Sequence, residues 1–119
     1  MNRLFVYGSL KKGYGNSGIL NGSEFLGESE TLPCFTMINY GFFPACLSDG
    51  ETIIHGEVYD VSDAVLARTD RLEGHPTFYQ RIRVTTKKFG TAWMYIVKSD
   101  SLKDPTLPII KSGKWEGEP

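Results

Sequence analysis

The segment Tyr7-Gly8-Ser9-Leu10 carries residue types that could bind an anion. It begins at the last residue of the apolar run 4–7 and leads into a loop with three glycines. A chain that leaves a buried strand through a glycine exposes successive backbone N–H groups, which can hold a carboxylate or a developing oxyanion. The same pattern fits an ordinary strand-to-loop turn in which Gly8 provides backbone freedom, and spacing alone favours that simpler interpretation. The spacing is not that of a phosphate-binding loop.

Glu73 is the residue that could exchange protons near neutral pH. In the last turn of a predicted helix its carboxylate would face the negative end of the helix dipole, and burial beside Leu72 and Phe78 would raise its pKa further. Such a carboxyl group can act as a general acid and base. A solvated glutamate at a helix end is the simpler alternative. Glu57 and Asp70 compete for the role, and the residues alone slightly favour Glu73.

Other catalytic chemistries find little support. Cys34, Cys46, His55 and His75 are the cysteines and histidines of the chain, and their spacing is neither that of a zinc site nor that of a disulfide framework. Neither histidine belongs to a recognisable Ser or Cys nucleophile motif. We therefore expect free cysteines and no metal.

Composition narrows the class of protein. The 119 residues include 13 Lys and Arg against 14 Asp and Glu, a formal net charge of −1, which argues against a dedicated nucleic-acid-binding protein. No apolar run approaches the roughly 20 residues needed to span a bilayer, and the N-terminus lacks the pattern of a signal peptide. We expect one domain over residues 1–119, a cytoplasmic location and no membrane association.

Most predicted elements that position these residues are short strands. The apolar runs 4–7 and 92–97 predict central strands, because both of their faces are apolar. Asp49-Gly50 predicts a turn, and the last 22 residues are expected to be irregular. Ile109, Ile110 and Trp115 are expected to dock that segment. Strands are predicted over 4–7, 55–61, 79–86 and 91–97. Two or three further short strands are predicted within 25–47.

One helix is predicted, from Ala64 to Glu73. Ser62-Asp63 supplies the N-cap, Gly74 the C-terminal stop, and Pro76 blocks any continuation. The predicted apolar stripe consists of Val65, Leu66, Thr69 and Leu72. Many short strands with one helix indicate an α+β fold.

Several of these segments resemble one known family. Tyr7-Gly8-Ser9-Leu10 resembles the Y-G-[ST]-L signature of the γ-glutamylcyclotransferase-like family, which includes the γ-glutamylamine cyclotransferases and the plant avirulence-induced proteins. The resemblance covers nearly the whole chain, although Lys114 stands where the family usually has Asp. The other segments similar to family motifs are Gly41-Phe42-Phe43-Pro44-Ala45, Gly56-Glu57-Val58-Tyr59-Asp60-Val61, Asp70-Arg71-Leu72-Glu73-Gly74 followed by Tyr79-Gln80-Arg81, and Lys111-Ser112-Gly113-Lys114-Trp115.

This resemblance implies an α+β fold with a small mixed β-barrel, one main helix and a cavity at the end of the first strand. It implies that Glu73 is the catalytic acid and base, and that Tyr7, Gly8, Ser9 and Leu10 bind the glutamyl end of the substrate. The implied reaction converts a γ-glutamyl amide to 5-oxoproline and a free amine without cofactor or metal. Chain length and the Y-G-S-L form favour the γ-glutamylamine subgroup.

An alternative is a non-catalytic binding module that senses a γ-glutamyl-like small molecule in the same pocket. Glu73 discriminates the two hypotheses, because only an enzyme would lose turnover when that carboxylate is removed. The amine carried by the substrate and the oligomeric state stay open. Candidate residues for the pocket walls are Tyr14, Phe42, Phe43, Phe78 and Tyr79.

Overall fold

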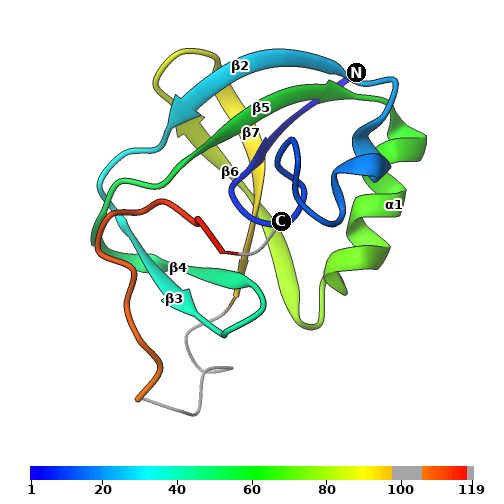
Figure 1. Ribbon diagram of the computed structural model, residues 1–119. Coiled ribbons are helices and arrows are strands. Elements are labelled where there is room, and N and C mark those ends of the chain that lie inside the picture. Colours follow the sequence, from blue (N-terminus) through cyan, green and yellow to red (C-terminus); the bar gives the residue numbers. More distant parts are fainter. Residues whose placement is uncertain (98–105, 118–119) are drawn as a thin grey trace.

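The computed structural model describes residues 1–97 and 106–117, which form a mixed α+β fold with one α-helix (Figure 1). The helix stands on one side of the strands, and a two-stranded hairpin lies on the other (Figure 1). The elements are β1 (Asn2–Val6), η1 (Ser17–Leu20, a 3₁₀ helix), β2 (Glu24–Glu30), β3 (Phe35–Asn39), β4 (Pro44–Thr52), β5 (His55–Val61), α1 (Asp63–Glu73), β6 (Tyr79–Thr86) and β7 (Gly90–Val97).

β1 is the central strand of the main sheet, as its apolar run predicts. The sheet has five strands in the order β2-β5-β1-β7-β6, and β3 pairs with β4 in a separate sheet of two strands. β1 runs antiparallel to β5 and parallel to β7. β7 is also internal, which confirms the second predicted central strand.

The alternating side chains of β1 divide the core into two parts. Leu4 and Val6 pack in a cluster shared with α1 and η1. Phe5 and Tyr7 pack in a second cluster shared with β3 and β4. Because successive strand residues point to opposite faces, one short strand anchors both layers. Each fully buried side chain of this kind contributes about 1.5–3 kcal/mol of transfer free energy.

The expected β-barrel is not confirmed. In the part of the chain that the structure describes, the two edge strands β2 and β6 meet through one isolated bridge, between Thr31 and Thr86. The backbone N–H of Lys87 also donates to the carbonyl of Glu30, at 2.9 Å. These contacts join the two edges at one corner, whereas a closed barrel needs a continuous ladder between them.

The helix forms as its capping residues predict. The Ser62 side chain accepts a hydrogen bond from the N–H of Val65, and Gly74 ends the helix in the left-handed conformation with φ of 68°. Within the predicted stripe Val65, Leu66 and Thr69 are buried, but Leu72 is 41% exposed. Leu72 departs from the prediction because the last turn of the helix borders a cavity.

The turn predicted at Asp49-Gly50 is wrong, because these residues lie inside β4. The β3–β4 connection falls at Tyr40–Phe43, where Gly41 has φ of 97°. Gly50 instead belongs to an irregular stretch in which Phe35 pairs with Thr52 while Thr36 pairs with Leu47. A side chain on Gly50 would collide with the backbone of Phe35, so a close approach requires the glycine.

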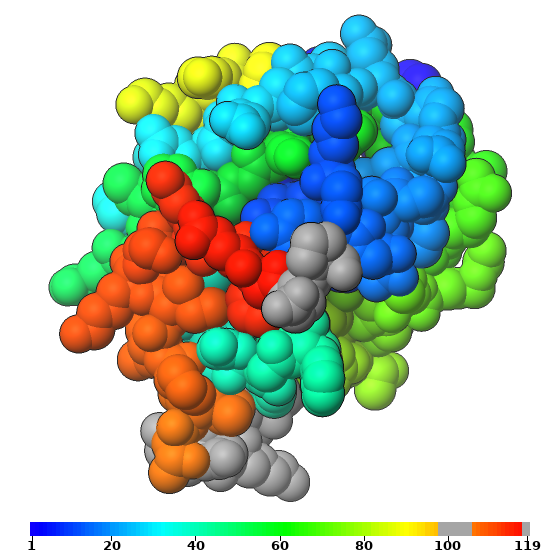
Figure 2. All heavy atoms as spheres, in the orientation of Figure 1, coloured from blue at the N-terminus to red at the C-terminus, as the bar shows by residue number. Residues whose placement is uncertain are grey.

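The C-terminal segment crosses the molecule beside the N-terminal loop (Figure 2). Trp115 is buried, and the backbone N–H of Ile110 donates to the carbonyl of Met37, which confirms the docking of both residues. Ile109 pairs with Ile38 in one backbone bridge, but its side chain is exposed. The remainder of the predicted irregular segment, 98–105 and 118–119, lies outside the described residues.

The close packing of β5 against the end of β1 can be tested by a substitution at Gly56. A methyl group there would meet the carbonyl oxygen of Val6 and the ring of Phe5. We expect Gly56→Ala to lower the free energy of unfolding in urea by about 1–3 kcal/mol, the usual cost of overpacking. Gly15→Ala is the matched control, because nothing lies within 4 Å of the position that its added methyl group would take. Equal stability of the two variants would contradict this packing.

Candidate active site

A cavity of about 230 Å³ lies where β1 ends. Its walls come from the end of β1 and the following loop, the start of β4, the end of α1 and the start of β6. The structure therefore brings together segments that are far apart in the sequence. The lining residues are Phe5, Val6, Tyr7, Gly8, Ser9, Leu10, Asn16, Phe43, Pro44, Leu72, Glu73, Phe78, Tyr79 and Tyr95.

The loop after β1 contributes three consecutive residues, Gly8, Ser9 and Leu10, to the lining of this cavity. Among the described residues no acceptor is recorded for the N–H groups of Gly8, Ser9 and Leu10, and all three residues line the cavity. Hydrogen bonds fix the loop: the N–H of Lys11 donates to the carbonyl of Gly8 at 3.0 Å, and the side-chain amide of Asn16 donates to the Ser9 hydroxyl at 2.8 Å. Successive unpaired N–H groups can bind an anion.

Gly8 is explained by a close approach to Pro44. Its φ is not positive, so backbone freedom does not account for the glycine. A Cβ atom on Gly8 would lie 3.0 Å from Cγ of Pro44, tighter than ordinary van der Waals contact. The missing side chain therefore lets the loop and the start of β4 form adjoining walls of the cavity.

Glu73 is the last residue of α1, and its side chain borders the cavity. Burial raises the pKa of its carboxyl group from 4.5 to about 7. Among the described residues Glu73 has no recorded hydrogen bond or ion pair, so nothing offsets the cost of burying its charge. The group is therefore balanced between its ionised and protonated forms near neutral pH.

Two buried tyrosines, Tyr7 and Tyr79, line the cavity. Burial and the nearby charge of Glu73 are among the causes that raise the pKa of Tyr7 and of Tyr79, so both phenols are neutral. The Tyr7 hydroxyl donates to the carbonyl of Tyr95, and the Tyr79 hydroxyl donates to the carbonyl of Pro44, both at 2.7 Å. Both hydroxyl protons are donated to backbone carbonyls, so the tyrosines form part of the cavity lining. Glu73 is the lining residue that can exchange a proton near neutral pH.

Asp70, one turn earlier on the helix, has a different environment. Its carboxylate accepts hydrogen bonds from Nε of Arg81 at 2.7 Å and from the Tyr95 hydroxyl at 2.6 Å. Burial raises the pKa of Asp70, but the hydrogen bonds from Arg81 and Tyr95 outweigh it and hold the pKa below its usual value. Asp70 is therefore ionised, and it fastens the end of α1 to β6 and β7.

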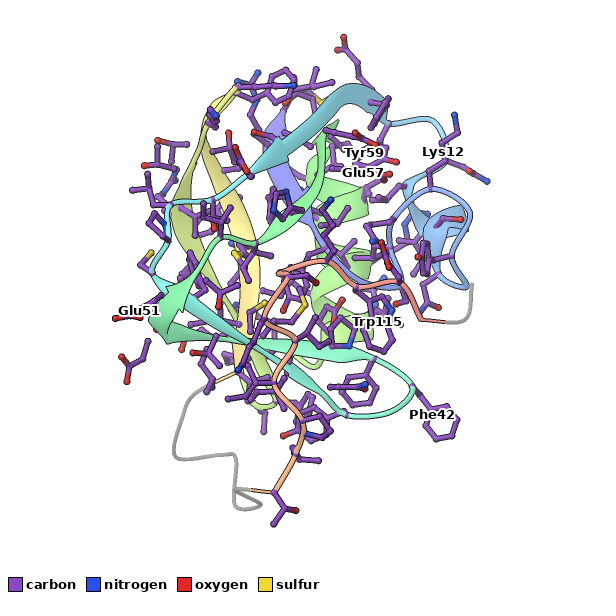
Figure 3. All side chains as sticks on the ribbon, turned by 60° about the vertical axis from the view of Figure 1, so that its left-hand side comes forward. Lys12, Phe42, Glu51, Glu57, Tyr59 and Trp115 are labelled. Carbon is purple, nitrogen blue, oxygen red and sulfur yellow. The ribbon has the colours of Figure 1, made fainter. Side chains whose placement is uncertain are left out.

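Glu57 lies in a second cavity, of about 360 Å³, on the other side of the loop. Its carboxylate accepts hydrogen bonds from the backbone N–H of Lys12 at 2.8 Å and from the Tyr59 hydroxyl at 3.0 Å (Figure 3). Of the three carboxylates considered from the sequence, only Glu73 lines the cavity that Gly8, Ser9 and Leu10 also line.

The predicted wall residues divide between several environments. Phe43, Phe78 and Tyr79 line the cavity that contains Glu73. Tyr14 belongs to the second cavity, and Phe42 points into solvent with 95% of its surface exposed (Figure 3). The expected role of Phe42 as a wall is therefore wrong, because the turn between β3 and β4 directs its ring outward.

Sequence reasoning missed two residues that hold the site together. Arg81 in β6 has a side chain that is only 20% exposed and is paired with Asp70. Tyr95 in β7 is buried and lines the cavity. The family resemblance, which links Asp70 and Arg81 in one motif, is the only sequence signal that pointed to this pair.

The described residues contain no group of three or more His, Cys, Asp and Glu side chains that could hold a metal ion. Cys34 and Cys46 are both free. Across the described ranges no helix is both long and apolar enough to cross a membrane.

Comparison with known proteins identifies the family. The family model described as gamma-glutamyl cyclotransferase, AIG2-like, matches residues 4–117. The chain belongs to this family. The gamma-glutamylcyclotransferase family protein YtfP of Escherichia coli is 35% identical to the chain over 115 residues, covering 95% of each protein.

Solved structures of similar proteins have the same fold as this chain. An uncharacterized protein from Pyrococcus horikoshii superposes with a TM-score of 0.80 at 31% identity, covering 96% of this chain and 89% of the other. An AIG2-like protein from Mus musculus gives a TM-score of 0.78 at 25% identity, covering 98% of this chain and 90% of the other. These likenesses support the mixed α+β architecture.

The ion pair between Asp70 and Arg81 can be tested through stability. We expect Arg81→Met to lower the free energy of unfolding by about 1–3 kcal/mol at pH 7, because Asp70 keeps a partly buried charge without its cation. The lowered pKa of Asp70 stabilises the fold above the unfolded value of 3.8, and this contribution is lost as the pH falls through the folded-state pKa. The difference from wild type should therefore shrink below about pH 4 in urea denaturation.

Arg83→Met is the matched control for this experiment. The guanidinium of Arg83 lies 4.4 Å from the centre of the Trp93 ring, and that of Arg81 lies 4.5 Å from it, so both variants lose the same ring contact. Among the described residues, only Arg81 of the two is paired with a carboxylate. A pH-independent loss of similar size in both variants would refute the role given to the ion pair.

Proposed function

We propose that this protein is a γ-glutamyl cyclotransferase of the γ-glutamylamine type, which converts a γ-glutamyl amide to 5-oxoproline and a free amine. One observation carries the proposal: a carboxyl group with a pKa of about 7 borders the same cavity as Gly8, Ser9 and Leu10, whose backbone N–H groups have no recorded acceptor among the described residues. The family of the chain supports the same class of reaction.

In the proposed reaction the α-amine of the glutamyl group attacks its own γ-carbonyl carbon. A bond forms between the α-nitrogen and that carbon, and the bond from the carbon to the amide nitrogen then breaks. Because both reacting groups belong to one molecule, the protein mainly has to fold the substrate into attack geometry. The buried lining residues Pro44, Tyr79 and Tyr95 suit that task.

Glu73 serves as the acid and base of this proposal. Its carboxylate takes a proton from the attacking amine, and the resulting acid returns one to the departing nitrogen. A pKa of about 7 suits both roles, since each form is populated near neutral pH. The N–H groups of Gly8, Ser9 and Leu10 hold the α-carboxylate or the developing oxyanion. In this scheme Tyr7 orients the loop, and no metal or organic cofactor takes part.

The first test is release of 5-oxoproline from γ-glutamyl-ε-lysine, γ-glutamyl-alanine, glutathione and γ-glutamyl-n-pentylamide. We expect wild type to release it from at least one of these compounds. Glu73→Gln should lower kcat roughly 10²- to 10⁴-fold, the usual contribution of a positioned acid or base. Glu57→Gln is the matched control, because its carboxylate lies in the second cavity, and it should leave kcat within about twofold of wild type. Circular dichroism checks that each variant is folded.

Failure of folded wild type to turn over any γ-glutamyl compound would contradict the proposed enzyme. Calorimetric binding of the same compounds without turnover would instead support the non-catalytic sensor. A loss of activity in Glu57→Gln equal to that in Glu73→Gln would move the acid and base away from the cavity at the end of β1.

The raised pKa of Glu73 also predicts how stability depends on pH. The folded state binds this proton more tightly than the unfolded state, so its stabilising contribution is fully present below about pH 4.5 and is lost as the pH rises to about 7. Glu73→Gln has no proton to lose. We therefore expect wild type to become less stable relative to Glu73→Gln over this range, by at most about 3 kcal/mol, since one pKa unit corresponds to about 1.4 kcal/mol.

Urea denaturation of both proteins at pH 4.5, 6 and 8 measures this difference. Other titrating groups are common to the two proteins, so their effects cancel in the comparison. A difference in stability that stays constant from pH 4.5 to pH 8 would mean that Glu73 is ordinarily solvated.

A further inference from the structure

The cavity that contains Glu73 opens between apolar side chains. Leu72 and Phe78 are the most exposed of its lining residues, each at 41%, and Phe43 beside them is half-buried. Large apolar side chains with this exposure on the rim of a cavity indicate a surface that a ligand covers. In contrast, the lining residues Tyr79 and Pro44 are buried and form the inner wall.

Contacts between aromatic rings hold this rim in place. The Phe78 ring lies 6.1 Å from that of Phe43 and 4.9 Å from that of Tyr79, centre to centre, both in edge-to-face geometry. Phe43 stacks on Tyr40 at 5.1 Å. Such pairs are mutually stabilising, so the exposed ring of Phe78 has a defined position before any ligand arrives.

The lining carries very little charge. Of the described residues that line the cavity, Glu73 is the only one with an acidic or basic side chain apart from the neutral tyrosines. The remaining polar side chains, Ser9 and Asn16, are hydrogen-bonded to each other. A cationic or zwitterionic group at the rim would therefore lose water without gaining a partner there, which is costly.

The size of the cavity decides which part of a substrate meets this rim. Its volume of about 230 Å³ is below the roughly 300–1,000 Å³ of pockets that enclose drug-sized ligands. The glutamyl end has to reach both Glu73 and the N–H groups of the loop. It therefore occupies the inner part, and the group on the amide nitrogen extends outward between Leu72 and Phe78.

We propose that the amine released by this protein carries an uncharged apolar group, which binds between Leu72, Phe43 and Phe78. This inference rests on the proposed function and adds the class of leaving group to it. Phe78 is then a specificity-determining residue: it contacts the departing group and takes no part in proton transfer.

Two nearly isosteric substrates test this proposal. In γ-glutamyl-n-pentylamide the chain on the amide nitrogen ends in a methyl group, and in γ-glutamyl-putrescine it ends in an ammonium group at the same position. We expect kcat/KM for the pentylamide to exceed that for the putrescine amide at least tenfold, within the range that an apolar pocket achieves for small changes in a substrate. Release of 5-oxoproline measures both reactions.

Phe78→Ser should lower kcat/KM for the pentylamide roughly tenfold and leave that for the putrescine amide within about twofold. Phe42→Ser is the matched control, because this exposed phenylalanine lies outside the cavity, and neither substrate should respond to it. Equal or faster turnover of the putrescine amide by wild type would overturn the proposal. So would an equal loss for both substrates in Phe78→Ser.

The test separates this inference from the proposed function. Turnover of both amides without preference would leave the cyclotransferase in place and overturn only the apolar leaving group. If neither amide were turned over, calorimetry with folded wild type and Phe78→Ser would still decide the preference. Tighter, Phe78-dependent binding of the pentylamide would support it, and equal or weaker binding of the pentylamide would overturn it.

Discussion

The Asp70–Arg81 ion pair, completed by the Tyr95 hydroxyl, is the interaction on which the arrangement of the cavity depends. It joins the last turn of α1 to two strands of the main sheet, three residues before the helix ends at Glu73. Two carboxylates on one helix thus have opposite surroundings. Asp70 has partners and stays ionised, whereas Glu73 has none recorded among the described residues and holds its proton to about pH 7. Asp70 fixes the end of the helix to the sheet, and Glu73 next to that anchor remains without a recorded partner among the described residues.

The surroundings of Glu73 cost the fold stability. An unpaired carboxyl group in a partly buried position weakens the fold wherever it ionises, and a glutamine in its place would not. The stabilising burial of the fold lies elsewhere, in the two cores around Leu4 and Phe5. The exposed side chains of Leu72 and Phe78 at the rim of the cavity also weaken the fold, since their apolar surface is left in water.

Local features were predictable from the sequence, and long-range ones were not. The helix follows from Ser62 and Gly74, whose caps act within one turn, and the central position of β1 follows from its uninterrupted apolar run. Asp49-Gly50 has the composition of a turn, but pairing with β3 draws it into a strand, and no local preference reveals that pairing. The juxtaposition of Glu73 with the loop after β1 likewise depends on the sheet order. Residue types pointed to both halves of the site, but only the resemblance joined them.

The pairing of β1 has a consequence for how the chain is made. Asn2 pairs with Val61, and Leu4 pairs in parallel with Trp93, so the N-terminal strand has no partner in the main sheet until half of the chain exists. β1 therefore leaves the ribosome before β5 and β7, its two neighbours in the sheet. Until β5 emerges, this segment is a target for chaperones or for association with other nascent chains. The strand at the centre of the finished sheet is thus also a segment that is open to misassociation during synthesis.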